Sequence, residues 1–179
     1  KLDGCEVITL SFALSIVFFV LLAVFLSFIN TRFLLIFVVA GLDLLAIFKY
    51  RFALLLPWRS LSKNSILLIL LLLGILVEGF ITFPSGYLYN NGLLFWSSQG
   101  FDGLWYISLI KAIGKGIPPI TPVFSGTYLQ NYHYLIDIFM GEFYRIYYFF
   151  SPYDLYFRFF PVFYSFLLGT SVFSFVSRW

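Results

Sequence analysis

Charged side chains are scarce in this sequence: Asp, Glu, Lys and Arg make up 11% of its 179 residues, whereas a soluble domain averages about 25%. Hydrophobic residues account for 61% and aromatic residues for 23%, and the mean hydropathy is +0.97. A globule of this size cannot enclose 25 Phe, 13 Tyr and 4 Trp side chains, so many of them have to face lipid. The composition excludes a soluble protein and predicts an integral membrane protein whose first partner is the lipid bilayer.

Cysteine and histidine each occur once, as Cys5 and His133, which excludes an internal disulfide and a Cys/His metal cluster. The basic residues behind the net charge of +3 are scattered between apolar runs rather than gathered in a patch, so we expect no nucleic-acid partner. The sequence also lacks a glycine-rich phosphate loop, a Gly-x-Ser-x-Gly elbow and an HExxH motif. Because the chain starts with Lys1 and ends at Trp179 directly after an apolar run, we expect it to be a piece of a longer polypeptide.

Long apolar runs predict about five membrane-spanning helices, since a bilayer core about 30 Å thick needs roughly 20 residues in helical form. The predicted spans are 7–29, 33–48, 66–83, 132–150 and 159–176. Three N-terminal spans thus occupy residues 1–83, a long polar loop occupies 84–131, and two further membrane helices occupy 132–179. The predicted fold class is an all-α polytopic membrane protein.

The distribution of charge around the spans predicts their orientation. The segment 49–65 holds four basic residues and no acidic one, a pattern typical of cytoplasmic loops. The third span then runs outward, which makes the loop 84–131 extracytoplasmic. Exposed loops on a rigid scaffold usually carry the chemistry of a protein, so we expect the functional residues in this loop.

An interfacial amphipathic helix is predicted in the middle of the loop. Asp102 is of a residue type favoured at helix N-caps. Apolar residues at helical spacing, among them Leu104 and Leu109, form one stripe, while Lys111 and Lys115 lie one turn apart on another face. We expect this helix to lie on the membrane surface and to end at the glycines and prolines that follow.

A further helix is predicted to start near Tyr128 and to descend into the membrane. At its entrance His133 and Asp137 stand four residues apart, which places both side chains on one helix face. The pair is therefore a candidate for binding a substrate or a cation.

Motif elements are spread over the stretch 100–137. They are Asp-Gly-Leu-Trp at 102–105, Gly-Ile-Pro-Pro at 116–119, Pro122, Gly126, and Asn-Tyr-His-Tyr-Leu at 131–135. This order resembles the first extracytoplasmic loop of the C-superfamily glycosyltransferases, membrane enzymes that include oligosaccharyltransferases, protein O-mannosyltransferases and aminoarabinose transferases. Many members have a second acid directly after the first, where this chain has Gly103, so the O-mannosyltransferase branch fits less well.

The resemblance implies transfer of a sugar from a polyprenyl-phosphate-linked donor to an acceptor on the extracytoplasmic face. Asp102 would act as general base at the membrane surface, a role that typically contributes about 10²–10⁴-fold in rate. Lys111 and Lys115 would offset the charge of the departing phosphate, with Arg145 and Arg158 as alternatives.

The second half of the motif supplies the other predicted site residues. Tyr132, His133 and Tyr134 are expected to contact substrate. Asp102, His133 and Asp137 would hold a divalent cation, as in those members of the family that use one, with Mg²⁺ or Mn²⁺ favoured by oxygen ligands and Mn²⁺ more tolerant of imidazole.

Other interpretations of the same residues stay open. Asp102 is also explained as a helix cap, and the two lysines as a face that binds lipid headgroups. The main alternative function is a transporter or channel component in which Asp43, Glu78 and Glu142 line a polar path through the membrane. A structural subunit of a membrane complex is a third possibility.

Overall fold

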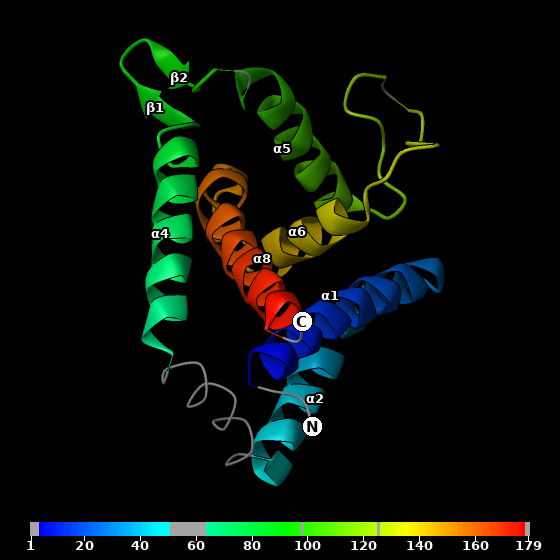
Figure 1. The fold of residues 1–179 in the computed structure, drawn as a ribbon. Helices are drawn as coiled ribbons and strands as arrows, with labels where there is room; N and C mark the ends of the chain where they lie inside the picture. The colour runs from blue at the N-terminus through cyan, green and yellow to red at the C-terminus, as the bar shows by residue number, and fades with distance from the viewer. Residues whose placement is uncertain (1–3, 51–63, 98, 125, 178–179) are drawn as a thin grey trace.

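The computed structural model describes residues 4–50, 64–97, 99–124 and 126–177, and this part of the chain is mostly helical (Figure 1). The helices are α1 (Gly4–Phe28), η1 (Arg32–Leu34), α2 (Leu35–Tyr50), α4 (Ser65–Thr82), α5 (Gln99–Lys115), α6 (Leu135–Ile146), α7 (Pro152–Asp154), η3 (Leu155–Phe159) and α8 (Phe160–Val176). One small antiparallel hairpin, β1 (Tyr87–Tyr89) and β2 (Gly92–Leu94), joins α4 to α5.

Four helical stretches are long and apolar enough to cross a membrane. They are Gly4–Phe28, Arg32–Tyr50, Ser65–Thr82 and Pro152–Val176. Their apolar side chains point largely outward, and single rings such as Phe28 and Phe80 are more than four-fifths exposed. The prediction of a mostly helical chain with long apolar helices is confirmed, and so many exposed rings favour contact with lipid over contact with water.

The last of these stretches starts seven residues before the predicted span 159–176. Ser151 provides the N-cap, since its hydroxyl accepts a hydrogen bond from the backbone N–H of Tyr153 over 3.1 Å, and Pro152 occupies the first helical position. Serine followed by proline is a favoured start for a helix. Five residues of the stretch, Leu155–Phe159, have π-helical hydrogen bonding.

The fourth predicted span, 132–150, is wrong in length. Helix α6 has 12 residues, and at about 1.5 Å per residue it is about 18 Å long. It also buries Asp137 and Glu142 among protein atoms. Helix α6 is therefore an internal helix of the fold rather than a lipid-facing span.

The predicted helix start near Tyr128 is also wrong. The chain forms an isolated bridge between Ile120 and Tyr128, with hydrogen bonds from Thr121 N to Thr127 O and from Leu129 N to Pro119 O. These hydrogen bonds hold the segment in an extended, non-helical conformation, and the loop continues to the start of α6. Most of the predicted cytoplasmic loop 49–65 lies outside the described residues, and the sidedness stays a prediction.

Two pairs of helices build the frame around the loop residues. Helix α4 packs along α8, and α5 packs along α6 (Figure 1). The second contact is close because Gly141 of α6 has no side chain: a Cβ there would lie 2.4 Å from Cγ2 of Ile113. Helix α5 is thus held against the protein along its length, with its start beside the hairpin and its end near α6.

Candidate functional site

A cavity of about 790 Å³ lies between α4, α5, α6 and α8. It is called the acidic pocket below, because Glu78 of α4 and Asp137 of α6 both line it. His133 and Tyr106 line it as well, so the pocket brings together residues from α4, from α5 and from the second half of the sequence motif. Its volume lies within the range of about 300–1,000 Å³ usual for small-molecule sites.

Asp137 is the most deeply buried polar group of this pocket. It is 1% exposed, and neither of its carboxylate oxygens has a hydrogen-bond partner among the described residues. Burial raises the pKa of Asp137 from 3.8 to about 6, although the nearby charge of His133 acts in the opposite direction. A buried carboxylate without a partner is costly for the folded state, which marks the residue as a functional candidate.

The two halves of the motif are joined by aromatic side chains. The indole Nε1 of Trp105 donates a hydrogen bond to the hydroxyl of Tyr132 over 3.0 Å, and their rings meet edge to face. The ring of Tyr132 stacks on His133 with centroids 4.8 Å apart. His133 precedes α6 rather than lying within it, so it reaches the acidic pocket through this stack and not through a shared helix face with Asp137.

The phenol of Tyr106 lies in an electrostatic environment that includes Asp102 and Asp137. Its pKa is raised to about 12, first by a hydrogen bond with Tyr132, then by burial, and then by the negative charges of Asp137 and Asp102. Tyr106 lies four residues after Asp102 on α5, and it lines the acidic pocket together with Asp137.

Asp102 itself is exposed and lies in the first turn of α5. The prediction that it caps the helix is wrong, because α5 starts three residues earlier at Gln99. A carboxylate in the first turn still interacts favourably with the positive end of the helix dipole. At this position the carboxylate does not accept the backbone hydrogen bond that an N-cap residue would accept.

Packing against Phe157 leaves no room for a second acid at position 103, directly after Asp102. A Cβ at Gly103 would lie 2.6 Å from Cζ of Phe157, whose side chain is 2% exposed. A larger residue would have to displace this buried ring. The close approach fixes the start of α5 against the start of the last membrane helix.

The predicted phosphate-binding lysines lie elsewhere. Lys111, Lys115 and Arg32 line a second cavity of about 750 Å³, called the basic pocket below. At about 100° per residue, Lys111 is on the opposite side of α5 from Asp102. The ammonium of Lys111 also lies 5.5 Å from the ring centroid of Tyr153. The structure does not bring these lysines together with the predicted base.

The predicted metal ligands are not gathered either. Within residues 4–50, 64–97, 99–124 and 126–177, no three side chains of His, Cys, Asp or Glu are close enough to hold a metal ion. His133 and Asp137 line the acidic pocket, whereas Asp102 is not among its lining residues. The donor set of Asp102, His133 and Asp137 therefore does not fit a single divalent cation in this arrangement.

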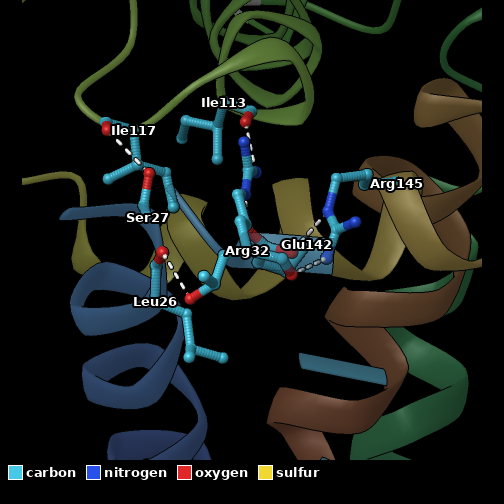
Figure 2. A network of polar contacts seen from close by, with 8 residues as sticks. Leu26, Ser27, Arg32, Ile113, Ile117, Glu142 and Arg145 are labelled. Atoms are coloured by element: carbon cyan, nitrogen blue, oxygen red, sulfur yellow. Dashed lines mark hydrogen bonds and ion pairs between the residues drawn. The ribbon is translucent and has the colours of Figure 1, made fainter. Parts of the chain in front are cut away.

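An ion-pair network that sequence reasoning missed holds α5, α6 and η1 together. Glu142 is fully buried and pairs with Arg32 and, over 2.8 Å, with Arg145 (Figure 2). Arg32 also donates to the backbone carbonyl of Ile113 near the end of α5, and Arg145 donates to the carbonyl of Arg32. The spacing of Glu142 and Arg145 was the one sequence signal, since residues three apart are neighbours on a helix.

Arg158 forms a second group of contacts near the start of α5. It pairs with Asp154, donates to the carbonyl of Ser85 over 2.9 Å, and lies 3.8 Å from the ring centroid of Tyr87. The hydroxyl of Ser85 in turn hydrogen-bonds to Gln99. Arg158 is thus tied to the end of α5 that carries Asp102, and its buried Nε has no partner in the described part of the chain.

The three acids of the predicted polar path do not share one environment. Asp43 is exposed on α2, Glu142 is enclosed by its two arginines, and Glu78 lines the acidic pocket.

Comparison with known proteins adds no family: no protein-family model, no curated protein and no solved structure matches the chain.

Proposed function

We propose that the chain is a glycosyltransferase of the C-superfamily type, or a part of one, and that it uses a polyprenyl-phosphate-linked sugar donor on the extracytoplasmic face. The observation that carries this proposal is the meeting of the two motif halves around Tyr106. The indole of Trp105 donates a hydrogen bond to Tyr132, and Tyr106, His133 and Asp137 line one cavity. Motif residues that converge beside a cavity of ligand size support a shared chemical task.

In the proposed reaction Asp102 is the general base. An acceptor hydroxyl or amine loses its proton to the carboxylate, and its electron pair forms the new bond to the anomeric carbon. The bond between the anomeric carbon and the phosphate oxygen breaks, and polyprenyl phosphate leaves with that electron pair. The exposure of Asp102 supports this role, because an acceptor that arrives from water can reach it.

An apolar groove supports a lipid-linked donor. A cavity of about 720 Å³ runs between α4 and α8 and is lined mainly by Leu, Val and Phe side chains. Glu78, Ser165 and Leu168 line both this groove and the acidic pocket, so the two are continuous. We assign the groove to the isoprenoid chain of the donor and the adjoining polar region to its sugar.

Arg158 is the cation best placed to offset the departing phosphate. It connects through Ser85 to Gln99 at the start of α5, and its Nε is available for a further hydrogen bond. Lys111 is nine residues beyond Asp102, which is about 13 Å along the helix axis. We therefore assign the phosphate role to Arg158 and leave the lysines of the basic pocket to lipid headgroups.

Sealed vesicles test the proposal. The full-length protein is inserted in one orientation, and a radiolabelled donor is incorporated in the bilayer. Water-soluble acceptors are then supplied either inside or outside. We expect labelled product only when the acceptor is on the side that carries the loop 84–131, located by labelling a cysteine introduced at the exposed Thr127. Product from the opposite side would overturn the assignment of the face.

A transporter remains the second candidate because Glu78, on a candidate span, faces the acidic pocket. A transporter would move the labelled donor or its sugar across the vesicle membrane without forming a new glycosidic bond. Analysis of the product by chromatography separates the two functions, since transport leaves the donor intact.

A further inference from the structure

The acidic pocket has a marked imbalance of charge. Two carboxylates line it, Glu78 from α4 and Asp137 from α6, and none of its described lining residues is Lys or Arg. The one basic group at its edge is the imidazole of His133. The three arginines of the described residues pair elsewhere: Arg158 with Asp154, and Arg32 and Arg145 with Glu142.

Asp137 is left without a partner by this arrangement. Its side chain is 1% exposed and both carboxylate oxygens lack hydrogen bonds among the described residues. Native proteins pair such groups, because a buried and unpaired charge strongly destabilises the folded state. A ligand that supplies positive charge and N–H donors would remove this cost.

The walls of the pocket suit an organic cation. The rings of Tyr106 and Tyr156 stack with centroids 5.5 Å apart and an interplanar angle of 17°. Phe160 and Tyr164 add a second stacked pair, and the hydroxyl of Tyr164 has no hydrogen-bond partner in the described part of the chain. Aromatic faces attract ammonium groups as well as the apolar carbons that carry them.

Two other ligand classes fit less well. A divalent metal ion needs several ligands within about 2–2.6 Å, and no group of three suitable side chains occurs among the described residues. A neutral sugar would leave the buried charge of Asp137 without compensation. Neither objection applies to a ligand that carries a primary ammonium.

We propose that the acidic pocket binds the ammonium group of an amine-bearing reactant, with Asp137 as its ion-pair partner, Glu78 as a second negative charge and the tyrosine rings as its walls. This inference deepens the proposed function, because it assigns a primary amine to the sugar or to the acceptor. Binding is measured without transfer, so the failure of one proposal is distinguishable from the failure of the other.

Two probes of equal ring size test the ammonium specifically. Cyclohexylamine and cyclohexanol are titrated into the full-length protein in lipid nanodiscs at pH 7.5 by calorimetry, with empty nanodiscs as the blank. We expect the amine to bind at least about tenfold more tightly than the alcohol. Asp137→Asn should raise the dissociation constant of the amine by about tenfold or more and leave that of the alcohol unchanged, and Glu78→Gln should have a smaller effect in the same direction.

The matched control is Asp43→Asn, which removes a carboxylate from an exposed position outside the pocket. This variant should bind the amine as the wild type does. Equal affinity for the two probes, or an unchanged amine affinity in a folded Asp137→Asn protein, would overturn the inference. Because Glu78→Gln changes a different helix, it keeps the test decisive if Asp137→Asn does not fold.

Discussion

The indole of Trp105 donates a hydrogen bond to the hydroxyl of Tyr132, and this contact joins two motif elements that lie 27 positions apart. Trp105 belongs to the Asp-Gly-Leu-Trp element, and Tyr132 to the Asn-Tyr-His-Tyr element. The bond links α5 to the residues before α6, where His133 stacks on the same tyrosine. The motif is therefore one structural unit, which explains why both of its halves contribute to the surroundings of Tyr106.

Any side chain at position 103 should lower the stability of the protein. In Gly103→Ala the new Cβ meets the ring of Phe157 at 2.6 Å, and overpacking of this kind typically costs about 1–3 kcal/mol. We expect a lower melting temperature in detergent and a lower kcat, because α5 has to shift with Asp102 on its first turn. Phe157→Leu in the same chain should restore part of both.

The control for this substitution is Gly79→Ala on α4, where nothing lies within 4 Å of a built Cβ. Alanine is favoured over glycine inside a helix, so this variant should be at least as stable as the wild type. If Gly103→Ala were as stable and as active as Gly79→Ala, the close contact with Phe157 would not fix the start of α5.

The ionisation of Asp137 should reduce stability at neutral pH. Its pKa is about 6 in the folded protein and 3.8 when unperturbed, so between these values the folded state binds a proton that the unfolded state has lost. The stabilisation by this proton is complete below pH 3.8 and is lost as the pH rises through 6. A shift of this size corresponds to about 3 kcal/mol.

Thermal denaturation of Asp137→Asn beside the wild type measures this effect. Asparagine does not ionise, so the variant should melt at a higher temperature than the wild type at pH 7.5, and the difference should shrink at pH 5. Glu78 and His133 also line this pocket, but both are present in each protein and their contributions largely cancel in the comparison. A variant that melts below the wild type at pH 7.5 would show that the charged carboxylate has a stabilising partner.

Glu142 should be essential for stability in a way that surface acids are not. Glu142→Gln leaves Arg32 and Arg145 without their common counter-charge, and breaking a buried ion pair typically costs about 3–5 kcal/mol. Asp154→Asn is the control, since the Asp154 side chain is 40% exposed in its pair with Arg158 and exposed pairs are worth about 0–1 kcal/mol. Similar melting temperatures for the two variants would contradict the structural role of Glu142.

Chelation distinguishes a metal-dependent reaction from an ammonium site. The resemblance implies Mg²⁺ or Mn²⁺ at Asp102, His133 and Asp137, but no group of three such ligands occurs among the described residues. We expect sugar transfer to persist in excess EDTA. A loss of transfer that Mn²⁺ restores would instead assign His133 and Asp137 to a divalent cation.

The four candidate spans could be predicted from the sequence because each is a continuous apolar run. The length of α6 could not, since its buried Glu142 is paired with Arg32, which is 110 positions away. Residues 132–150 are rich in aromatic side chains, but composition alone does not distinguish rings that pack on protein from rings that face lipid.

The candidate site, too, could be predicted from the sequence only where it depends on local residues. Of the residues that the motif indicated, His133 and Asp137 line the acidic pocket and Asp102 does not. Local spacing could not reveal Glu78 and Tyr156, which reach this pocket from distant helices. The lysines looked suitable because they share a helix with Asp102. Their place on its opposite side follows from the helical rotation between residues 102 and 111.

The most direct test of the central claim is sugar transfer by the full-length protein beside its Asp102→Asn variant. Membranes that contain equal amounts of each protein receive radiolabelled polyprenyl-phosphate sugars and a panel of hydroxyl and amine acceptors. We expect transfer by the wild type and a loss of about 10²-fold or more in the variant, with equal membrane insertion of both. Undiminished transfer by Asp102→Asn would contradict the role of Asp102 as the base, and no transfer by well-inserted wild-type protein from any donor would contradict the glycosyltransferase itself.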